Sequence, residues 1–78
     1  MVCAQLTLSS APIGRQFRIR HLHSQAEVSA RLREMGFCEN TIVRCIMKGD
    51  GNVICEVRNS RVGLNDMLAD SIILAAHE

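Results

Sequence analysis

The chain has 78 residues and a formal net charge of +1, from nine basic and eight acidic residues. A chain of this length forms one domain with a small core, which we assign to residues 1–78. The balanced charge and the small number of aromatic residues, Phe17 and Phe37, argue against a protein that binds nucleic acid. The longest apolar run, Ile72 to Ala76, is far below the roughly 20 residues of a membrane span. The N-terminal residues lack the features of a signal peptide. We therefore expect a cytoplasmic protein without direct membrane insertion.

The first regular elements are a strand and a helix. Apolar and basic residues alternate over Gln16–Leu22, which predicts a half-buried strand after a turn-rich opening. A helix is predicted over Gln25–Met35, because Val28, Leu32 and Met35 recur at helical spacing and form one inward-facing apolar stripe.

Both ends of this helix have recognisable signals. Ser24 and Glu27 have the spacing of a capping box, in which the serine is the N-cap and the glutamate bonds back to it. Gly36 suits the left-handed residue that ends a helix, and Phe37 would then dock the next segment on the core.

A hairpin is predicted next, with strands at Thr41–Met47 and Val53–Arg58 joined through Lys48–Asn52. A two-residue Asp50-Gly51 turn would mix apolar and charged residues on one face. A three-residue loop, Gly49-Asp50-Gly51, keeps the faces separate, so we expect the pairs Met47 with Val53, Cys45 with Cys55, and Val43 with Val57.

The remaining chain predicts a turn at Asn59-Ser60 and a strand over Arg61–Leu64, which places Val62 opposite Val57 and Leu64 opposite Cys55. Asn65 is expected to cap a short helical turn over 65–69, and Ser71–Ala75 a last strand. About five short strands with one inserted helix, at about residues 25–35, predict a mainly β fold that closes into a small barrel.

The cysteines and histidines are candidate metal ligands by residue type. Cys3, Cys38, Cys45 and Cys55 lack the C-x-x-C spacing of zinc and redox sites, so we interpret them as structural thiols. His21 and His23 would lie on one face of a strand and are the only metal candidates, with Glu27 or His77 as a conceivable third ligand. Exposed histidines are the preferred interpretation. We therefore predict no metal site, no cofactor and no catalytic residues.

The order of these parts resembles the FeoA family, the small ferrous-iron transport proteins A. The resemblance rests on Leu8…Pro12-Ile13-Gly14, on the helix end Arg31-Leu32-Arg33-Glu34-Met35-Gly36-Phe37, on Thr41-Ile42-Val43, and on Val62-Gly63-Leu64…Leu68-Ala69-Asp70-Ser71-Ile72-Ile73-Leu74. The chain departs from the family at Glu39-Asn40 and in the short Lys48–Asn52 loop. The resemblance implies an SH3-like β-barrel carrying a helix and no enzymatic activity. It also implies a role in iron transport beside the cytoplasmic part of a FeoB-type ferrous-iron permease.

Two surfaces are candidates for binding that partner: the outer helix face with Arg31, Arg33 and Glu34, and the hairpin tip with Lys48 and Asp50. One alternative is the SH3-like module of an iron-responsive transcription regulator, for which no upstream DNA-binding segment is expected before Met1. The other is a metal chaperone that uses His21, His23 and a cysteine. The sequence leaves open whether the domain self-associates.

Overall fold

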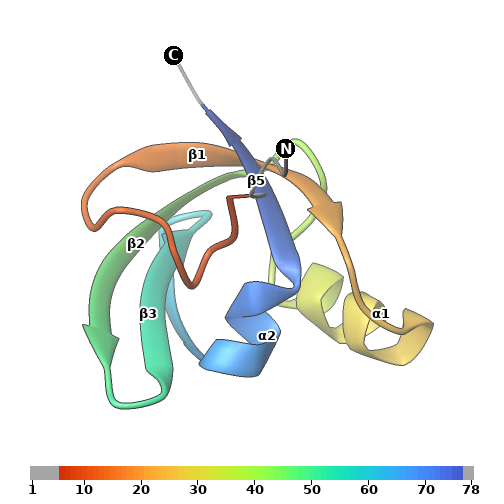
Figure 1. Ribbon diagram of the computed structural model, residues 1–78. Helices are drawn as coiled ribbons and strands as arrows, with labels where there is room; N and C mark the ends of the chain where they lie inside the picture. The colour runs from red at the N-terminus through yellow and green to blue at the C-terminus, as the bar shows by residue number, and fades with distance from the viewer. Residues whose placement is uncertain (1–5, 77–78) are drawn as a thin grey trace, which may run out of the picture.

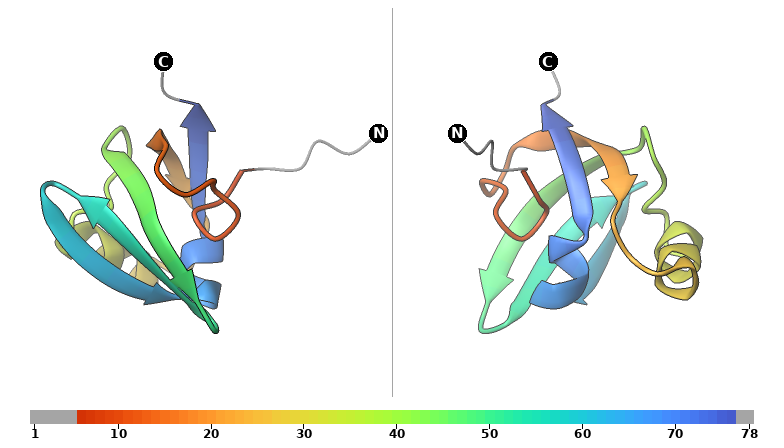
Figure 2. Two further views of the ribbon diagram at one scale, coloured as in Figure 1. Left: turned by 90° about the vertical axis from the view of Figure 1, so that its left-hand side faces the viewer. Right: turned by 45° about the vertical axis from the view of Figure 1, so that its right-hand side comes forward.

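The computed structural model describes residues 6–76, and their elements are shown in Figure 1. In chain order they are β1 (Gln16–Leu22), α1 (Ala26–Glu34), β2 (Ile42–Gly49), β3 (Asn52–Val57), β4 (Ser60–Asn65), α2 (Asp66–Asp70) and β5 (Ile72–Ala76). The strands form one antiparallel sheet in the order β4-β3-β2-β1-β5, which curls strongly on itself in both views of Figure 2. The expected mainly β architecture with five strands is confirmed. Neither helix in the described part is long and apolar enough to span a membrane.

The core lies on the concave side of this curled sheet. Every second residue of the strands points there, so that β1 buries Phe17 and Ile19 while Arg18 stays exposed. The N-terminal segment adds Leu8, whose amide donates to the Ile72 carbonyl at 3.0 Å. Among the described residues, the fully buried ones are Leu8, Ala11, Ile19, Leu32, Phe37, Val43, Cys45, Val53, Cys55, Val57, Ala69 and Ile72. The expected burial of Leu32 and Phe37 is therefore confirmed.

The β2–β3 hairpin pairs Val43 with Val57 and Cys45 with Cys55, as the sequence predicts. The predicted pair of Met47 with Val53 is wrong, because the register shifts between Cys45 and Met47. The extra residue of this β-bulge lets Met47 pair with Ile54 and lets a two-residue Asp50-Gly51 loop close the hairpin. The predicted register requires an unbroken ladder of residue pairs, which the bulge interrupts.

The β3–β4 turn is also tighter than predicted. Arg58 and Asn59 both have positive φ, 51° and 66°, which is the backbone of a two-residue type I′ turn. The ladder therefore starts with Val57 opposite Ser60 and places Cys55 opposite Val62, two residues from the predicted register. A shift of two residues leaves the inward and outward faces unchanged, so the buried side chains were still assigned correctly.

The predicted capping box at the start of α1 is wrong. The N-cap is Gln25, whose side chain makes no capping bond, and the helix begins one residue later than a Ser24 cap requires. The Ser24 hydroxyl lies instead 2.7 Å from the hydroxyl of Ser29, a buried polar side chain on α1. Glu27 lies in the first turn, where its negative charge interacts favourably with the positive end of the helix dipole.

The predicted stop at Gly36 is confirmed. Gly36 has φ of +104°, its amide donates to the Arg33 carbonyl at 3.0 Å, and the Phe37 amide donates to the Leu32 carbonyl at 2.9 Å. These two bonds form a Schellman motif, which satisfies carbonyls that the helix end would leave unpaired. The Asn65 cap of α2 is likewise present, since its side-chain oxygen accepts from the Leu68 amide at 2.8 Å.

Candidate functional site

An apolar groove of about 300 Å³ lies between the two helices. We call it the α1–α2 groove. Val28, Leu32 and Met35 of α1 and its C-cap line one wall, Leu68 of α2 lines the other, and Arg31 and Glu34 complete the lining. This volume is at the lower limit of small-molecule sites, so the groove suits a few apolar side chains of another protein.

The groove exists because α1 is only partly buried. Within the helix, Ser29 and Leu32 are its buried residues, and Val28 is half-buried. Met35 was predicted to belong to the inward-facing apolar stripe of the helix. This prediction is wrong, because Met35 is 41% exposed. Leu32 alone reaches the core fully, while the flanking apolar residues border the groove and leave apolar surface open to solvent. Met67, which precedes Leu68 on α2, does not line the groove and is 83% exposed.

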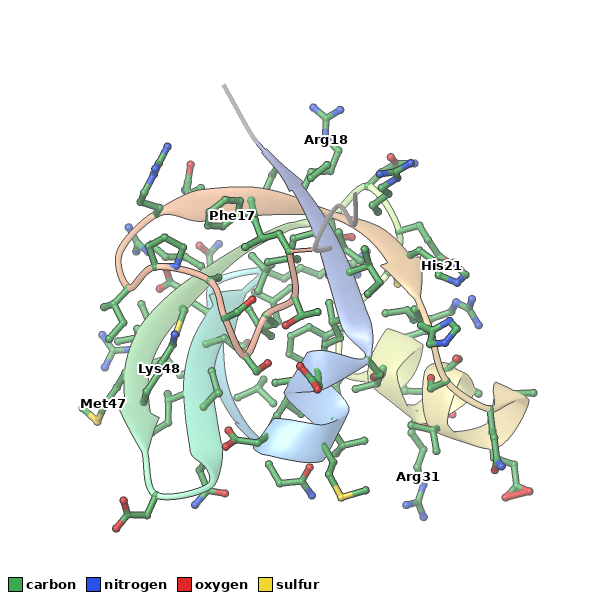
Figure 3. The ribbon with its side chains drawn as sticks, in the orientation of Figure 1. Phe17, Arg18, His21, Arg31, Met47 and Lys48 are labelled. Atoms are coloured by element: carbon green, nitrogen blue, oxygen red, sulfur yellow. The ribbon has the colours of Figure 1, made fainter. Side chains whose placement is uncertain are left out.

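The three charged residues predicted on the helix face separate into two environments. Arg31 and Glu34 lie at the groove, and Figure 3 shows Arg31 pointing away from the body of the protein below α1. Arg33 lies elsewhere and binds Glu39 through two hydrogen bonds, at 2.9 Å to Oε2 and 3.3 Å to Oε1. The hydrogen bond and charge of Arg33 lower the pKa of the Glu39 carboxyl, and Glu39 in turn raises the pKa of Arg33. Arg33 therefore helps to fix the loop after α1.

The second predicted surface, the hairpin tip, does not line the groove. Lys48 and Asp50 are exposed there, and Figure 3 shows Lys48 and Met47 on the side of the molecule opposite Arg31. The tip is tied to α2, because the Asp66 amide donates to the Gly51 carbonyl at 2.9 Å. Gly63, quoted in the family motif, lies on β4 in open space, and nothing in the structure requires glycine there.

The metal candidates remain an isolated pair. The rings of His21 and His23 are 6.0 Å apart and tilted by 52°, and Figure 3 shows His21 at the end of β1. Among residues 6–76, no three His, Cys, Asp or Glu side chains lie close enough to share a metal ion. Cys3 and His77 lie outside the described residues.

The two hairpin cysteines are core residues. Cys45 and Cys55 face each other across β2 and β3, both fully buried, and both thiols are free. Burial raises the pKa of Cys45 and raises that of Cys55 to about 12, so neither thiol is a ready thiolate. This supports their interpretation as structural residues.

The family model of the FeoA domain matches residues 6–76 of the chain. The chain belongs to the FeoA family. This is a family of non-catalytic, SH3-like accessory domains linked to iron transport. No curated protein matches the chain.

Solved structures of the family have the same fold. The FeoA of Stenotrophomonas maltophilia, a prokaryotic SH3 domain protein complexed with zinc, is 26% identical, with a TM-score of 0.74 over 90% of this chain and 89% of that one. The iron(II) transport protein A of Clostridium thermocellum has a TM-score of 0.84 at 24% identity, and the match spans 91% of this chain but 45% of that one. The predicted SH3-like barrel is confirmed.

The same fold also occurs within larger proteins. The match to ScaR with bound Zn²⁺ has a TM-score of 0.82 at 19% identity and covers 94% of this chain but 37% of that one. A likeness at this identity shows a shared fold alone. It does not carry the activity of the larger protein over to this FeoA-domain chain.

Proposed function

We propose that this protein is a non-enzymatic, cytoplasmic accessory protein of ferrous-iron uptake that binds the cytoplasmic part of a FeoB-type permease through the α1–α2 groove. Membership of the FeoA family supports the role in iron transport. The open apolar groove supports the mode of action, because exposed apolar surface on a small domain is typical of a protein-binding site.

The observation that carries the proposal is the exposure of Met35. A small domain has few apolar side chains for its core, and α1 places one of them beside a groove instead of inside the protein. Exposed apolar surface next to charged residues is typical of a protein interaction site. Methionine suits such a site because its flexible side chain adapts to the partner.

The groove also defines the chemistry of its partner. Val28, Met35 and Leu68 would receive apolar side chains, such as those of one face of a short helix. Arg31 and Glu34 have opposite charges and are one helical turn apart, so they favour one direction of the bound segment. We expect a modest affinity that decreases as salt is added.

A pair of methionine variants tests this proposal. Met35→Glu places a charge in the groove, whereas Met47→Glu places the same charge at the hairpin tip, where Met47 is 56% exposed. Binding to the purified cytoplasmic part of the permease is measured by calorimetry, and ferrous-iron uptake is measured in cells that lack the wild-type protein. We expect Met35→Glu to weaken binding by about tenfold or more, equivalent to about 1.4 kcal/mol, and to reduce uptake.

Met47→Glu is expected to bind and to support uptake as the parent does. Thermal unfolding of both variants checks that they are folded. Equal binding by a folded Met35→Glu variant and the parent would show that the groove is not the contact surface.

A further inference from the structure

The charges of the protein are separated in space, although they nearly cancel in the sequence. Six charged residues, five basic and one acidic, lie on the outward side of the sheet and in the β3–β4 turn. We call this surface the arginine face, and its residues are Arg18, Arg20, Arg44, Glu56, Arg58 and Arg61. Its formal charge is +4. The other charged residues of the described chain are four basic and six acidic, giving −2. The protein therefore has a basic surface although its net charge is close to zero.

The strand register brings these arginines together. Gln16, Arg44, Glu56 and Arg61 occupy one continuous row across β1, β2, β3 and β4. Arg18 lies in the next row, opposite Ile42. Figure 3 shows Arg18 pointing outward from β1, on the opposite side of the molecule from Arg31 at the α1–α2 groove. The pocket of the arginine face described below and the groove share no lining residue, although Arg58 lies near Gly36, which follows Met35 of the groove.

A polar pocket of about 300 Å³ opens within this face, lined in part by Gln16, Arg44, Glu56, Arg58 and Asn59. Hydrogen-bond donors outnumber acceptors there. Arg44 uses Nη2 to bind the Glu56 carboxylate, while its Nε is buried and has no acceptor among the described residues. A buried donor without an acceptor is unfavourable, and Glu56 accepts from only one nitrogen of this guanidinium group.

We propose that the arginine face binds an acidic segment of a partner protein, with one carboxylate of that segment in the pocket beside Arg44 and Arg58. Guanidinium groups bind carboxylates through paired hydrogen bonds, whereas Glu56 makes a single hydrogen bond to Arg44, through Nη2. A nucleic acid fits less well. The two aromatic residues, Phe17 and Phe37, are buried and cannot stack on bases, and Glu56 repels a continuous row of phosphates.

This inference goes beyond the proposed function, because it uses a different surface and does not depend on the groove. The test uses a fluorescent synthetic peptide in which glutamate alternates with alanine, titrated with the 78-residue chain and followed by anisotropy. A second peptide with glutamine in place of glutamate is the matched neutral control. We expect binding of the glutamate peptide alone, and weaker binding at higher salt.

Three variants locate the site. Arg18→Gln combined with Arg58→Asn removes two charges from the face, and asparagine tolerates the positive φ at position 58. We expect this variant to lose about tenfold in affinity. Arg31→Gln combined with Lys48→Gln removes the same charge elsewhere and is expected to bind as the parent does. Glu56→Gln releases Arg44 from its internal partner and is expected to bind the peptide several-fold more tightly.

Equal weakening by the two double variants would overturn the inference, because net charge alone would then explain binding. It would also be overturned if oligothymidylate or phosphatidylglycerol vesicles bound more tightly than the glutamate peptide. Thermal unfolding confirms that each variant is folded. Failure of this test leaves the proposed function standing, since Met35→Glu and Met47→Glu probe other surfaces.

Discussion

Replacing Gly36 by alanine tests how the helix stop stabilises this small domain. At φ of +104° a residue with a Cβ is strained, and the left-handed conformation costs about 1–2 kcal/mol. A Cβ at this position would lie 3.5 Å from Cδ of Arg58 and 3.6 Å from Cγ1 of Val57, which is ordinary contact. The expected cost of Gly36→Ala is therefore the backbone strain alone.

In a domain of this size, about 1–2 kcal/mol lowers the melting temperature by about 4–16 °C. Gly36→Val adds methyl groups beside Val57 and Arg58, and overpacking costs roughly 1–3 kcal/mol more. Gly36→Asn is expected to lose less than Gly36→Ala, because asparagine tolerates the left-handed conformation.

Thermal unfolding followed by circular dichroism measures these differences. The control is Gly49→Ala, since Gly49 lacks a positive φ and a Cβ there would meet nothing within 4 Å. We expect that control to change stability by less than about 0.5 kcal/mol. If Gly36→Ala and Gly49→Ala melt at the same temperature, the argument from backbone strain is refuted.

Three further predictions concern single contacts. Asn65→Ala should lower the free energy of unfolding by about 1 kcal/mol, while Asn65→Asp, which keeps the capping oxygen, should lose less; equal losses in urea titrations would argue against the cap. Arg33 lowers the pKa of Glu39, so their pairing stabilises the fold at neutral pH and is lost as the pH falls through the folded pKa of Glu39; an NMR titration in which Arg33→Gln fails to raise that pKa would contradict this. Burial raises the pKa of Cys55 to about 12, so mass spectrometry should find half-exposed Cys38 alkylated in the folded protein and Cys55 only after unfolding; rapid alkylation of native Cys55 would disprove its protection.

Local patterns predicted much of the fold. Alternation located the strands, helical spacing located α1, and Gly36 and Asn65 marked two helix ends through well-defined backbone requirements. Hairpin register was harder, because neither the bulge between Cys45 and Met47 nor the tight turn at Arg58-Asn59 has a clear sequence signal. Both depend on how the strands curl around the core.

The candidate surfaces were only partly visible in the sequence. The sequence predicted Arg31 and Glu34 to be exposed charged residues of the helix. The apolar groove beside them also needs Leu68, which belongs to a helix much later in the sequence. Helical spacing predicted that both Leu32 and Met35 are buried, which is correct for Leu32 and wrong for Met35. Periodicity gives the direction of a side chain, but it does not show whether another part of the chain covers it. The arginine face was missed because net charge adds residues without regard to position.

Chemical-shift mapping of the isotope-labelled protein with the cytoplasmic part of a FeoB-type permease tests the central claim most directly. We predict that the backbone amide resonances of Val28, Leu32, Met35 and Leu68 change in chemical shift in proportion to the fraction of bound partner. The amide resonances of the hairpin tip are expected to keep their chemical shifts. The same titration with Met35→Glu should require about tenfold more partner. Shifts confined to the hairpin tip or to the arginine face, with the groove amides unchanged, would contradict the account.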